Sequence, residues 1–279
     1  MAKELANIRL NDGNEMPRLG FGVWQVPDSS VAAAVGEALR TGYRSIDTAQ
    51  GYENEEGVGK AIAASAIARS ELFITTKLRN GQQGYDSALK AFDLSMEKLG
   101  LDVLDLFLIH WPVPSADKYV ETWKAFARLR EEGRVRSIGV SNFNADHLTR
   151  IMGETGAVPA VNQIELHPGF QQQALRDIHA AHGIAIECYS PLGRGTMLSN
   201  PVIMKIAAKH GVSPAQAIIR WHLDQGFIVI PKSTTPVRIA ENFNVFGFTL
   251  DAEDRNAIAA LDDAQGKLGP DPATFAVMF

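Results

Sequence analysis

Four polar residues stand at or just after the carboxyl ends of strand-like runs, the positions that carry chemistry in sheets built from strand–helix units. Asp47 ends the run 43–47, Lys77 ends the run 72–77 and His110 ends the run 104–110. Tyr52 follows Asp47 on a short loop. An acid, an amine, an imidazole and a phenol at one face of a sheet are the parts of a proton-transfer site. The pattern therefore predicts an enzyme.

Each of these residues has an ordinary interpretation when taken alone. Asp47 is typical of a turn or helix cap, Tyr52 of a surface aromatic, Lys77 of a solvated strand end and His110 of a core histidine. Together they favour a site, because buried Lys and Asp side chains must pair. A nearby ammonium lowers the pKa of a phenol from its reference value of about 10. We therefore expect Lys77 to lower the pKa of Tyr52 and make it a proton donor.

The sequence offers no nucleophile and no metal centre beside this proton donor. His179 and His182 are spaced as on one face of a helix, and we expect them at the helix surface rather than on a metal. The segment 139–143 departs from the G-x-S-x-G pattern at its last position, so a serine nucleophile is not expected there. A proton donor without a nucleophile indicates carbonyl reduction with hydride from a bound cofactor.

Two loops near the end of the chain have the composition of a phosphate site. In strand–helix barrels the loops after strands 7 and 8 commonly bind phosphate. Here those loops contain residues 190–195 and 232–235, and Arg238 follows on the next predicted helix. Hydroxyls, a Lys and an Arg near one helix start favour an anion. The alternative is a basic helix start that is simply solvated.

The order of elements predicts an α/β fold, a (β/α)8 TIM barrel with an N-terminal β-hairpin, in a single domain spanning residues 1–279. The hairpin is predicted from residues 8–10 and 15–16, on either side of a turn at 11–13. A dinucleotide-binding fold is disfavoured because no complete G-x-G-x-x-G occurs. Eight strands and seven helices are expected, with glycine after a last helical turn at 42, 100, 133, 183, 211 and 226. The strands are 20–23, 43–47, 72–77, 104–110, 135–140, 160–165, 184–189 and 227–231, and the helices are 29–40, 55–66, 87–99, 118–132, 145–154, 173–182 and 214–225.

Composition limits the environment and the partners. The chain has 279 residues, 46% of them hydrophobic, and a net charge of −5, which gives no reason to expect nucleic acid or a membrane as partner. One cysteine excludes an intramolecular disulfide and suits a reducing compartment. The N-terminus is too polar for a signal peptide. We expect a cytoplasmic protein.

Six motifs, in the same order as in the family, resemble those of the aldo-keto reductases. They are residues 42–49, 74–78, 108–112, 139–143, 162–168 and 230–233. Within that family the chain is most similar to short bacterial members that include 2,5-diketo-D-gluconate reductases. The resemblance implies that Tyr52 is the general acid, that Lys77 and Asp47 tune it, and that His110 orients the carbonyl.

The resemblance also implies that the cofactor is NADPH. Ser141, Asn142 and Gln163 would hold the nicotinamide carboxamide, with Tyr189 stacked on the ring. The pyrophosphate would be bound by Ser190, Leu192 and Gly193. The 2′-phosphate would be bound by Lys232, Ser233, Thr234 and Arg238. The adenine would be bound by Glu241 and Asn242. Gly22, Val23 and Trp24 would add cofactor contacts, and Trp24, Tyr52, His110 and Trp111 would line the substrate pocket.

The expected activity is NADPH-dependent reduction of small activated carbonyl compounds: α-dicarbonyls, aldehydes and keto-sugar acids such as 2,5-diketo-D-gluconate. The loops after His110 and Gly193 are short beside those of larger members, so we expect an open pocket. A monomer is expected. Two alternatives are a non-catalytic NADP(H)-binding sensor, of the kind found as channel β subunits, and an aldolase that uses Lys77 as a Schiff-base amine.

Overall fold

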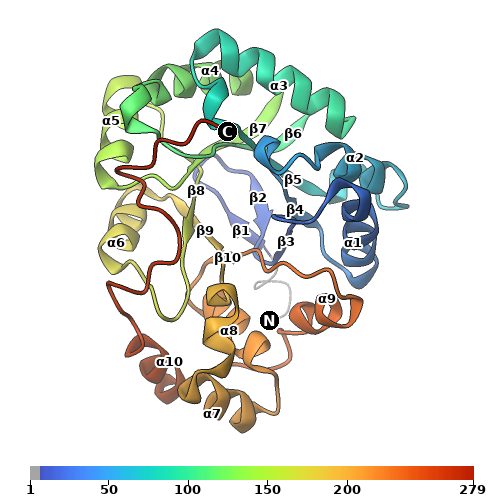
Figure 1. The fold of residues 1–279 in the computed structure, drawn as a ribbon, viewed down its shortest axis with the longest axis vertical. Helices are drawn as coiled ribbons and strands as arrows, with labels where there is room; N and C mark the ends of the chain where they lie inside the picture. The colour runs from blue at the N-terminus through green and yellow to red at the C-terminus, as the bar shows by residue number, and fades with distance from the viewer. Residues whose placement is uncertain (1–6) are drawn as a thin grey trace.

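The computed structural model describes residues 7–279. The main feature of the fold is an eight-stranded parallel barrel (Figure 1). Neighbouring strands pair in chain order from β3 to β10. A parallel bridge between Leu19 and Val229 and a 2.8 Å hydrogen bond from Val229 N to Arg18 O link the first barrel strand to the last. The predicted (β/α)8 barrel is therefore confirmed. The barrel strands are β3 Gly20–Gly22, β4 Ser45–Asp47, β5 Phe73–Leu78, β6 Leu104–Ile109, β7 Val135–Ser141, β8 Val161–Glu165, β9 Ala185–Tyr189 and β10 Ile228–Val229.

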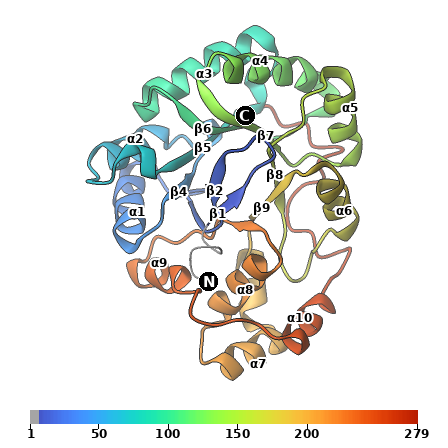
Figure 2. The same ribbon diagram turned by 180° about the vertical axis from the view of Figure 1, so that it is seen from behind.

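The predicted N-terminal hairpin is also confirmed. Strands β1 (Asn7–Arg9) and β2 (Glu15–Pro17) pair antiparallel. They cross the end of the barrel that faces the viewer in Figure 2. Leu10 and Met16 pack there against barrel residues that include Leu106, Leu108 and Val161. The hairpin thus closes this end with apolar side chains, and a site has to lie at the other end.

Helices surround the barrel and bury their apolar faces against it (Figure 1). The six predicted glycine stops all have positive φ, between +65° and +125°, which confirms them. The start of α8 shows a complete set of signals, because Ser213 and Gln216 form a capping box around Pro214. The helices are α1 Asp28–Thr41, α2 Glu55–Ala63, α3 Tyr85–Leu99, α4 Tyr119–Glu131, α5 Ala145–Thr155, α6 Gln173–His182, α7 Pro201–His210, α8 Pro214–Asp224, α9 Pro236–Phe243 and α10 Ala252–Ala259.

The differences from the sequence prediction are local. Helices α7, α9 and α10 lie outside the seven predicted ranges, although α9 is the helix on which Arg238 was expected. Helices α7 and α10 pack beside each other beyond the ring (Figure 1). The last barrel strand is shorter than 227–231, although Gly22 N still donates to Pro231 O over 3.3 Å. The surface position expected for His179 is wrong. That side chain is fully buried and lies 2.9 Å from the Asn162 amide, whereas His182 is exposed as expected.

No helix within residues 7–279 combines the length and apolar character needed to cross a membrane. The same residues hold no cluster of His, Cys, Asp and Glu arranged for a metal ion.

Candidate active site

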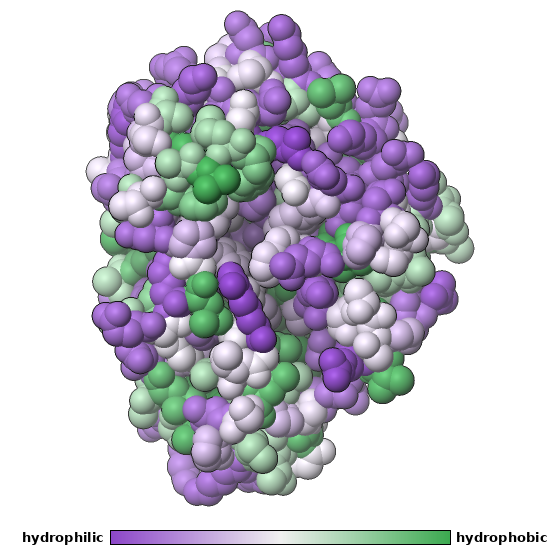
Figure 3. All heavy atoms as spheres, in the orientation of Figure 1, coloured by the Kyte–Doolittle hydropathy of each residue, from purple (hydrophilic) through white to green (hydrophobic). Residues whose placement is uncertain are grey.

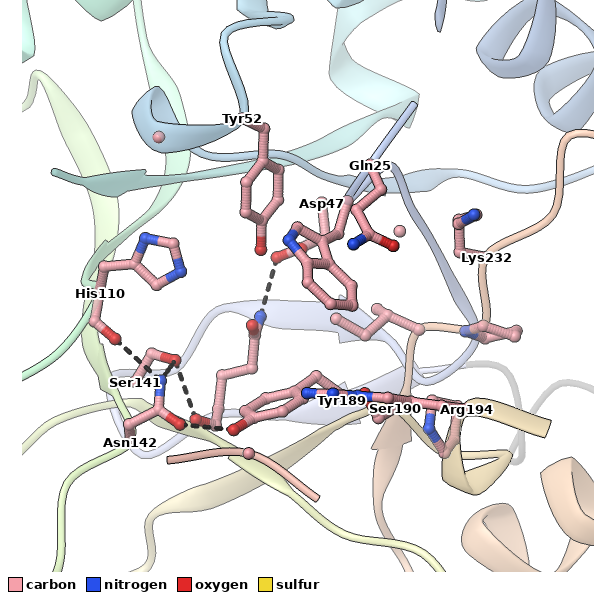
Figure 4. Close-up of a pocket in the computed structure, with 18 of the residues that line it drawn as sticks. Gln25, Asp47, Tyr52, His110, Ser141, Asn142, Tyr189, Ser190, Arg194 and Lys232 are labelled. Carbon is pink, nitrogen blue, oxygen red and sulfur yellow. Dashed lines mark hydrogen bonds between the residues drawn. The ribbon is translucent and has the colours of Figure 1, made fainter. Parts of the chain in front are cut away.

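A cavity of about 770 Å³ opens at the carboxyl ends of the barrel strands, opposite the hairpin. Figure 3 shows the hollow near the centre of this face, and Figure 4 shows the side chains that line it. Three of the predicted catalytic residues, Asp47, Tyr52 and His110, are part of the wall. The structure therefore brings the ends of β4 and β6 and the loop after β4 together around one space.

Lys77 lies directly behind this wall. Its ammonium is fully buried on β5 and contacts three oxygens, at 2.6 Å from Asp47 Oδ1, 2.9 Å from the Thr48 carbonyl and 3.3 Å from the Tyr52 hydroxyl. Burial would lower the pKa of Lys77, but the Asp47 carboxylate and the Tyr52 phenol outweigh it and raise that pKa. Lys77 is therefore a charged hydrogen-bond donor.

The ionisation of Tyr52 differs from the sequence expectation. Burial raises the pKa of the Tyr52 phenol, and the opposing effect of Lys77 does not overcome it. The expectation that Lys77 lowers the Tyr52 pKa below its usual value is therefore wrong for the protein alone. The main physical reason is burial of the phenol, and the negative charge of Asp47 also raises the Tyr52 pKa against the effect of Lys77. Tyr52 is protonated at neutral pH.

His110 faces Tyr52 across the cavity, with ring centroids 5.6 Å apart in an edge-on arrangement (Figure 4). Burial, helped by the charge on Lys77, lowers the pKa of His110 well below its usual value. The imidazole is therefore neutral at neutral pH and carries one N–H. Its backbone carbonyl accepts a 2.9 Å hydrogen bond from Asn142 Nδ2, which fixes the end of β6 against β7.

The loop that carries Tyr52 is held by two buried amides that sequence reasoning missed. Asn54 donates to the carbonyls of Val23 and Val26 at 3.0 and 2.9 Å. Gln50 donates to Ala91 O and Ser95 Oγ on α3 at 2.9 and 2.8 Å. A lone Asn or Gln in a loop carries no sequence signal for such a role. The bonds fix the phenol at the distance from Lys77 that a hydrogen bond requires.

One side of the cavity is a polar surface, the Tyr189 platform, formed by Ser141 and Asn142 at the end of β7 and Tyr189 at the end of β9. The Tyr189 hydroxyl donates to Asn142 Oδ1 over 2.8 Å, and Ser141 Oγ lies 3.0 Å from Asn142 Nδ2 (Figure 4). Asn142 adopts a φ of +62°, which is uncommon outside glycine. These bonds stabilise that conformation and leave the Tyr189 ring beside the cavity.

Gln163 joins the platform to Asp47, one of the predicted catalytic residues. Its Nε2 donates to Asp47 Oδ2 at 2.8 Å and to Glu187 Oε2 at 2.8 Å. Glu187 is a fully buried acid in the middle of β9 that the sequence analysis did not single out. The available signal was a carboxylate within an otherwise apolar strand, two residues before Tyr189.

A neighbouring part of the cavity wall is formed by the loops after β9 and β10. Ser190, Leu192, Lys232 and Arg238 line it, as do Gly22 and Trp24 near the end of β3. Lys232 and Arg238 are exposed, and within residues 7–279 neither forms an ion pair. Arg194, which sequence reasoning missed, lies over the Trp24 ring with its guanidinium carbon 5.4 Å from the centroid. Two cations therefore remain available to an anionic ligand at this side.

Six of the residues predicted to contact a cofactor do not line this cavity. Val23 is buried in the core, and its N–H bonds to the Asp47 carbonyl over 3.1 Å. Ser233 is buried and accepts from Thr235 N at 3.1 Å. The others are Gly193, Thr234, Glu241 and Asn242, which lie in the same loops or on α9 outside the wall.

The C-terminal tail supplies a wall that the sequence analysis did not predict. Phe275 packs on Trp111 with ring centroids 4.3 Å apart, and Phe279 lies edge-on to His110 at 5.4 Å. Phe279 also sits against Gly51, where a Cβ would come within 2.7 Å of its ring. The expected open pocket is therefore covered on one side by two aromatic rings.

Comparison with known proteins gives a consistent result. The family model described as Aldo/keto reductase family matches residues 18–263. An aldo-keto reductase of Mycolicibacterium smegmatis is 58% identical over 96% of this chain and 97% of its own length. The methylglyoxal reductase DkgA of Salmonella typhimurium is 55% identical over 96% of this chain and 97% of its length.

Solved structures agree in fold as well as in sequence. A variant of Gox0644 in complex with NADPH superposes with a TM-score of 0.94 at 55% identity, over 96% of this chain and 98% of that one. An aldo-keto reductase from Brucella melitensis gives 0.89 at 57% identity, over 92% and 99% of the two chains. With a family model that spans most of the barrel and relatives above half identity, the chain belongs to the aldo-keto reductase family.

Proposed function

We propose that this protein is an NADPH-dependent reductase of small activated carbonyl compounds, with Tyr52 as the proton donor. The observation that carries the proposal is the Tyr52 hydroxyl, which borders the cavity 3.3 Å from the buried ammonium of Lys77. The relative from Salmonella typhimurium is a methylglyoxal reductase, and the Gox0644 variant is in complex with NADPH. Both support the same chemistry for this chain.

The cavity has the features that a dinucleotide phosphate requires. The flat ring of Tyr189 suits a nicotinamide, and Ser141, Asn142 and Gln163 offer polar atoms to its carboxamide. The Gln163 Oε1 atom has no hydrogen-bond partner within the described chain, which leaves it free to accept from the carboxamide. Lys232 and Arg238 offer positive charge at the other side, suited to a 2′-phosphate. We further propose that Ser233 and Thr234 contact the 2′-phosphate and that Glu241 and Asn242 contact the adenine.

The proposed reaction uses the protonated state of Tyr52. When bound, NADPH supplies the hydride to the carbonyl carbon. The Tyr52 hydroxyl donates its proton to the carbonyl oxygen, and the resulting phenolate is stabilised by Lys77 at 3.3 Å. Neutral His110 donates its N–H to the same oxygen and orients it. Asp47 holds Lys77 in place over 2.6 Å.

The substrate class follows from the walls near Tyr52. Trp24, Trp111, Phe275 and Phe279 are apolar, and Tyr52 and His110 are the polar groups among them. With the tail in place, the space suits small activated carbonyls: α-dicarbonyls, aldehydes and keto-sugar acids such as 2,5-diketo-D-gluconate. We further propose that residues 1–279 act as one domain and that the protein is a cytoplasmic monomer.

The two alternatives predict different chemistry at Lys77 and Tyr52. An aldolase needs Lys77 as a free amine, but its ammonium donates to three oxygens and its pKa is raised. A non-catalytic sensor would have no use for a proton donor, so its function would not depend on the Tyr52 hydroxyl.

The test is Tyr52→Phe, which removes the proton donor and keeps the ring. We expect kcat for methylglyoxal to fall by roughly a hundredfold or more, the scale of lost acid catalysis. NADPH affinity, measured by fluorescence titration, should change by less than about threefold, because the hydroxyl is not among the proposed cofactor contacts.

Tyr43→Phe is the matched control, since it deletes a phenol oxygen outside the cavity that makes a weak 3.4 Å contact with Ile239 O. It should leave kcat near the parent value. A Tyr52→Phe enzyme that reduced methylglyoxal at the parent rate would show that another group delivers the proton.

A further inference from the structure

Glu187 is a fully buried carboxylic acid that the proposed reaction does not use. It stands in the middle of β9, in register with Gln163 of β8 and Ile228 of β10. Its Oε1 atom is buried without a hydrogen-bond partner in the described chain. Buried acids are rare unless paired, and no cation bonds to this one within residues 7–279. A buried acid without a bound cation at this position therefore needs a physical explanation.

A single amide connects this acid to the catalytic residues. Gln163 Nε2 donates one proton to Asp47 Oδ2 and one to Glu187 Oε2, both over 2.8 Å. An amide nitrogen has two protons, so both are used. The Asp47 carboxylate also settles the orientation of the amide, because a flipped side chain would direct its oxygen at an acceptor oxygen of Asp47. Gln163 Oε1 is consequently the atom left for a ligand.

The groups around Glu187 determine its charge. Asp47 of β4 and Lys77 of β5 both act on it, Tyr52 faces it from the loop after β4, and Cys188 follows it in the strand. Burial, together with the negative charge of Asp47, raises the pKa of Glu187 to about 8. At neutral pH, therefore, Glu187 is a neutral acid. Lys77 pairs instead with Asp47, over 2.6 Å.

We propose that Glu187 is a positioning residue: its carboxyl group accepts from the Gln163 amide and fixes it so that Gln163 Oε1 meets the nicotinamide carboxamide. The neutral form of Glu187 also leaves the charge of Asp47 to Lys77. The inference rests on the proposed function, because it assigns the cofactor amide to Gln163. Ionised Glu187 would add a second negative charge near the phenol, and that charge raises the pKa of Tyr52. A Tyr52 of higher pKa is a weaker proton donor, so reduction slows once Glu187 loses its proton.

Two substitutions separate the acceptor from the acid. Glu187→Gln keeps a neutral acceptor oxygen of the same shape, and Glu187→Met removes it. We expect the Gln variant to hold NADP+ affinity and kcat/KM for methylglyoxal within about threefold of the parent at pH 7. The Met variant should bind NADP+ roughly three- to tenfold more weakly, as expected for a lost hydrogen bond that orients the site. Cys188→Ala is the control, since Cys188 is equally buried in the same strand but packs toward the helices, and it should match the parent.

The pH profile tests the proton on Glu187. In the parent, kcat/KM for reduction should decline through an inflection near pH 8, where Glu187 ionises. Glu187→Gln has no proton to lose there, so the inflection should disappear. A purely structural role for Glu187 would move stability and leave this inflection in place.

Thermal stability gives a second, activity-free measure. Between the ordinary Glu pKa of 4.5 and about 8, the unfolded chain releases this proton while the folded chain keeps it. The free energy of unfolding of the parent therefore falls as pH rises across that window, and the decrease is complete above it. The melting temperature of Glu187→Gln, relative to the parent, should rise from pH 5 to pH 8 and then level off.

The results distinguish failure of this inference from failure of the proposed function. A parent that binds NADP+ but does not reduce methylglyoxal contradicts the proposed substrate class, while the affinity order of the Gln and Met variants still tests Glu187. Equal NADP+ affinity of the two variants would contradict a positioning role for Glu187. So would a Gln variant that keeps the inflection near pH 8 and whose melting temperature differs from that of the parent by the same amount at every pH.

Discussion

The ammonium of Lys77 is fully buried, and its contacts with Asp47, Thr48 and Tyr52 are all at hydrogen-bond distance. Removing one partner of a buried ion pair typically costs roughly 3–5 kcal/mol, because the other charge stays without compensation. The same contact stabilises the Tyr52 phenolate formed in the proposed reaction. Stability and the proposed catalysis should therefore both depend on Lys77, and a pair of substitutions separates the two effects.

Lys77→Met should lower kcat for methylglyoxal by about a hundredfold or more and lower the melting temperature, because Asp47 loses its partner. Adding Asp47→Asn removes the uncompensated carboxylate, so the double variant should recover melting temperature without recovering kcat. The measurements are steady-state NADPH oxidation and thermal unfolding at pH 7. A single variant with parental turnover would contradict the role given to the ammonium.

The proposed catalytic residues could be selected from the sequence because strand ends are marked by a change from apolar to polar residues. Asp47, Lys77 and His110 each interrupt such a run, and the barrel brings their ends together. Glu187 and Asn54 act through contacts with residues far along the chain, such as Gln163 and Val23. Sequence spacing does not encode those contacts. The direction of the Tyr52 pKa was mispredicted for a related reason, since burial is a property of the assembled cavity.

At the level of elements, the C-terminal tail is held to the barrel by Glu165, the last residue of β8. Its carboxylate accepts from Leu268 N at 2.6 Å and Gly269 N at 2.8 Å, and His167 Nε2 lies 3.3 Å away. A Cβ on Gly269 would lie 2.8 Å from Glu165 Oε2, so only a glycine at this position lets the tail backbone come this close to the carboxylate. Burial raises the pKa of Glu165, but the His167 and backbone hydrogen bonds outweigh it and lower the pKa overall.

Glu165→Gln leaves one acceptor oxygen for the two backbone N–H groups of Leu268 and Gly269. The amide NH2 that replaces the second oxygen then faces one of these N–H groups. The tail should loosen, and amide hydrogen exchange at Leu268 and Gly269 should accelerate about tenfold or more, the scale of a lost charge-assisted bond. KM for methylglyoxal should rise, because Phe275 and Phe279 would no longer cover the site. Unchanged exchange at both amides would mean that other contacts hold the tail.

In the parent, the same attachment should weaken in acid. A lowered Glu165 pKa means that the carboxylate contributes stability above its ordinary range, and that this contribution is lost as pH falls through the folded-state pKa. The tail itself was not predictable from sequence. Residues beyond α10 have no helical or strand periodicity, and their position depends on Glu165 and on Asn80, which donates to Val277 O over 2.8 Å.

At the scale of the molecule, the cavity extends from the Tyr189 platform to α9 on the far side of the strand ends. A ligand that spans it connects parts of the barrel distant in sequence and stabilises the folded state as a whole. NADP+ should therefore raise the melting temperature more than NAD+ at equal concentration, by virtue of its 2′-phosphate. A charged contact of this kind contributes about 1.5–3 kcal/mol, or roughly ten- to a hundredfold in affinity.

Arg238→Ala should remove most of the NADP+ advantage, and the lost shift should be about 2–4 °C for each kcal/mol of binding free energy. The NAD+ shift should stay as it is, because NAD+ has no 2′-phosphate to lose. Arg40→Ala is a suitable control, since this exposed arginine of α1 pairs only with Glu37 on its own helix among the described residues. Equal loss of both shifts would assign Arg238 to another part of the dinucleotide.

The closure of the barrel has a consequence for how the chain is made. The hydrogen bond from Val229 N to Arg18 O joins residues from opposite ends of the sequence. At a synthesis rate of roughly 5–20 residues per second, the time between synthesis of β3 and synthesis of β10 is on the order of 10–40 s. Throughout that interval the growing sheet has exposed edges that can pair with other chains. Translation of the segment between β3 and β10 is therefore the period in which a nascent chain most needs protection by chaperones.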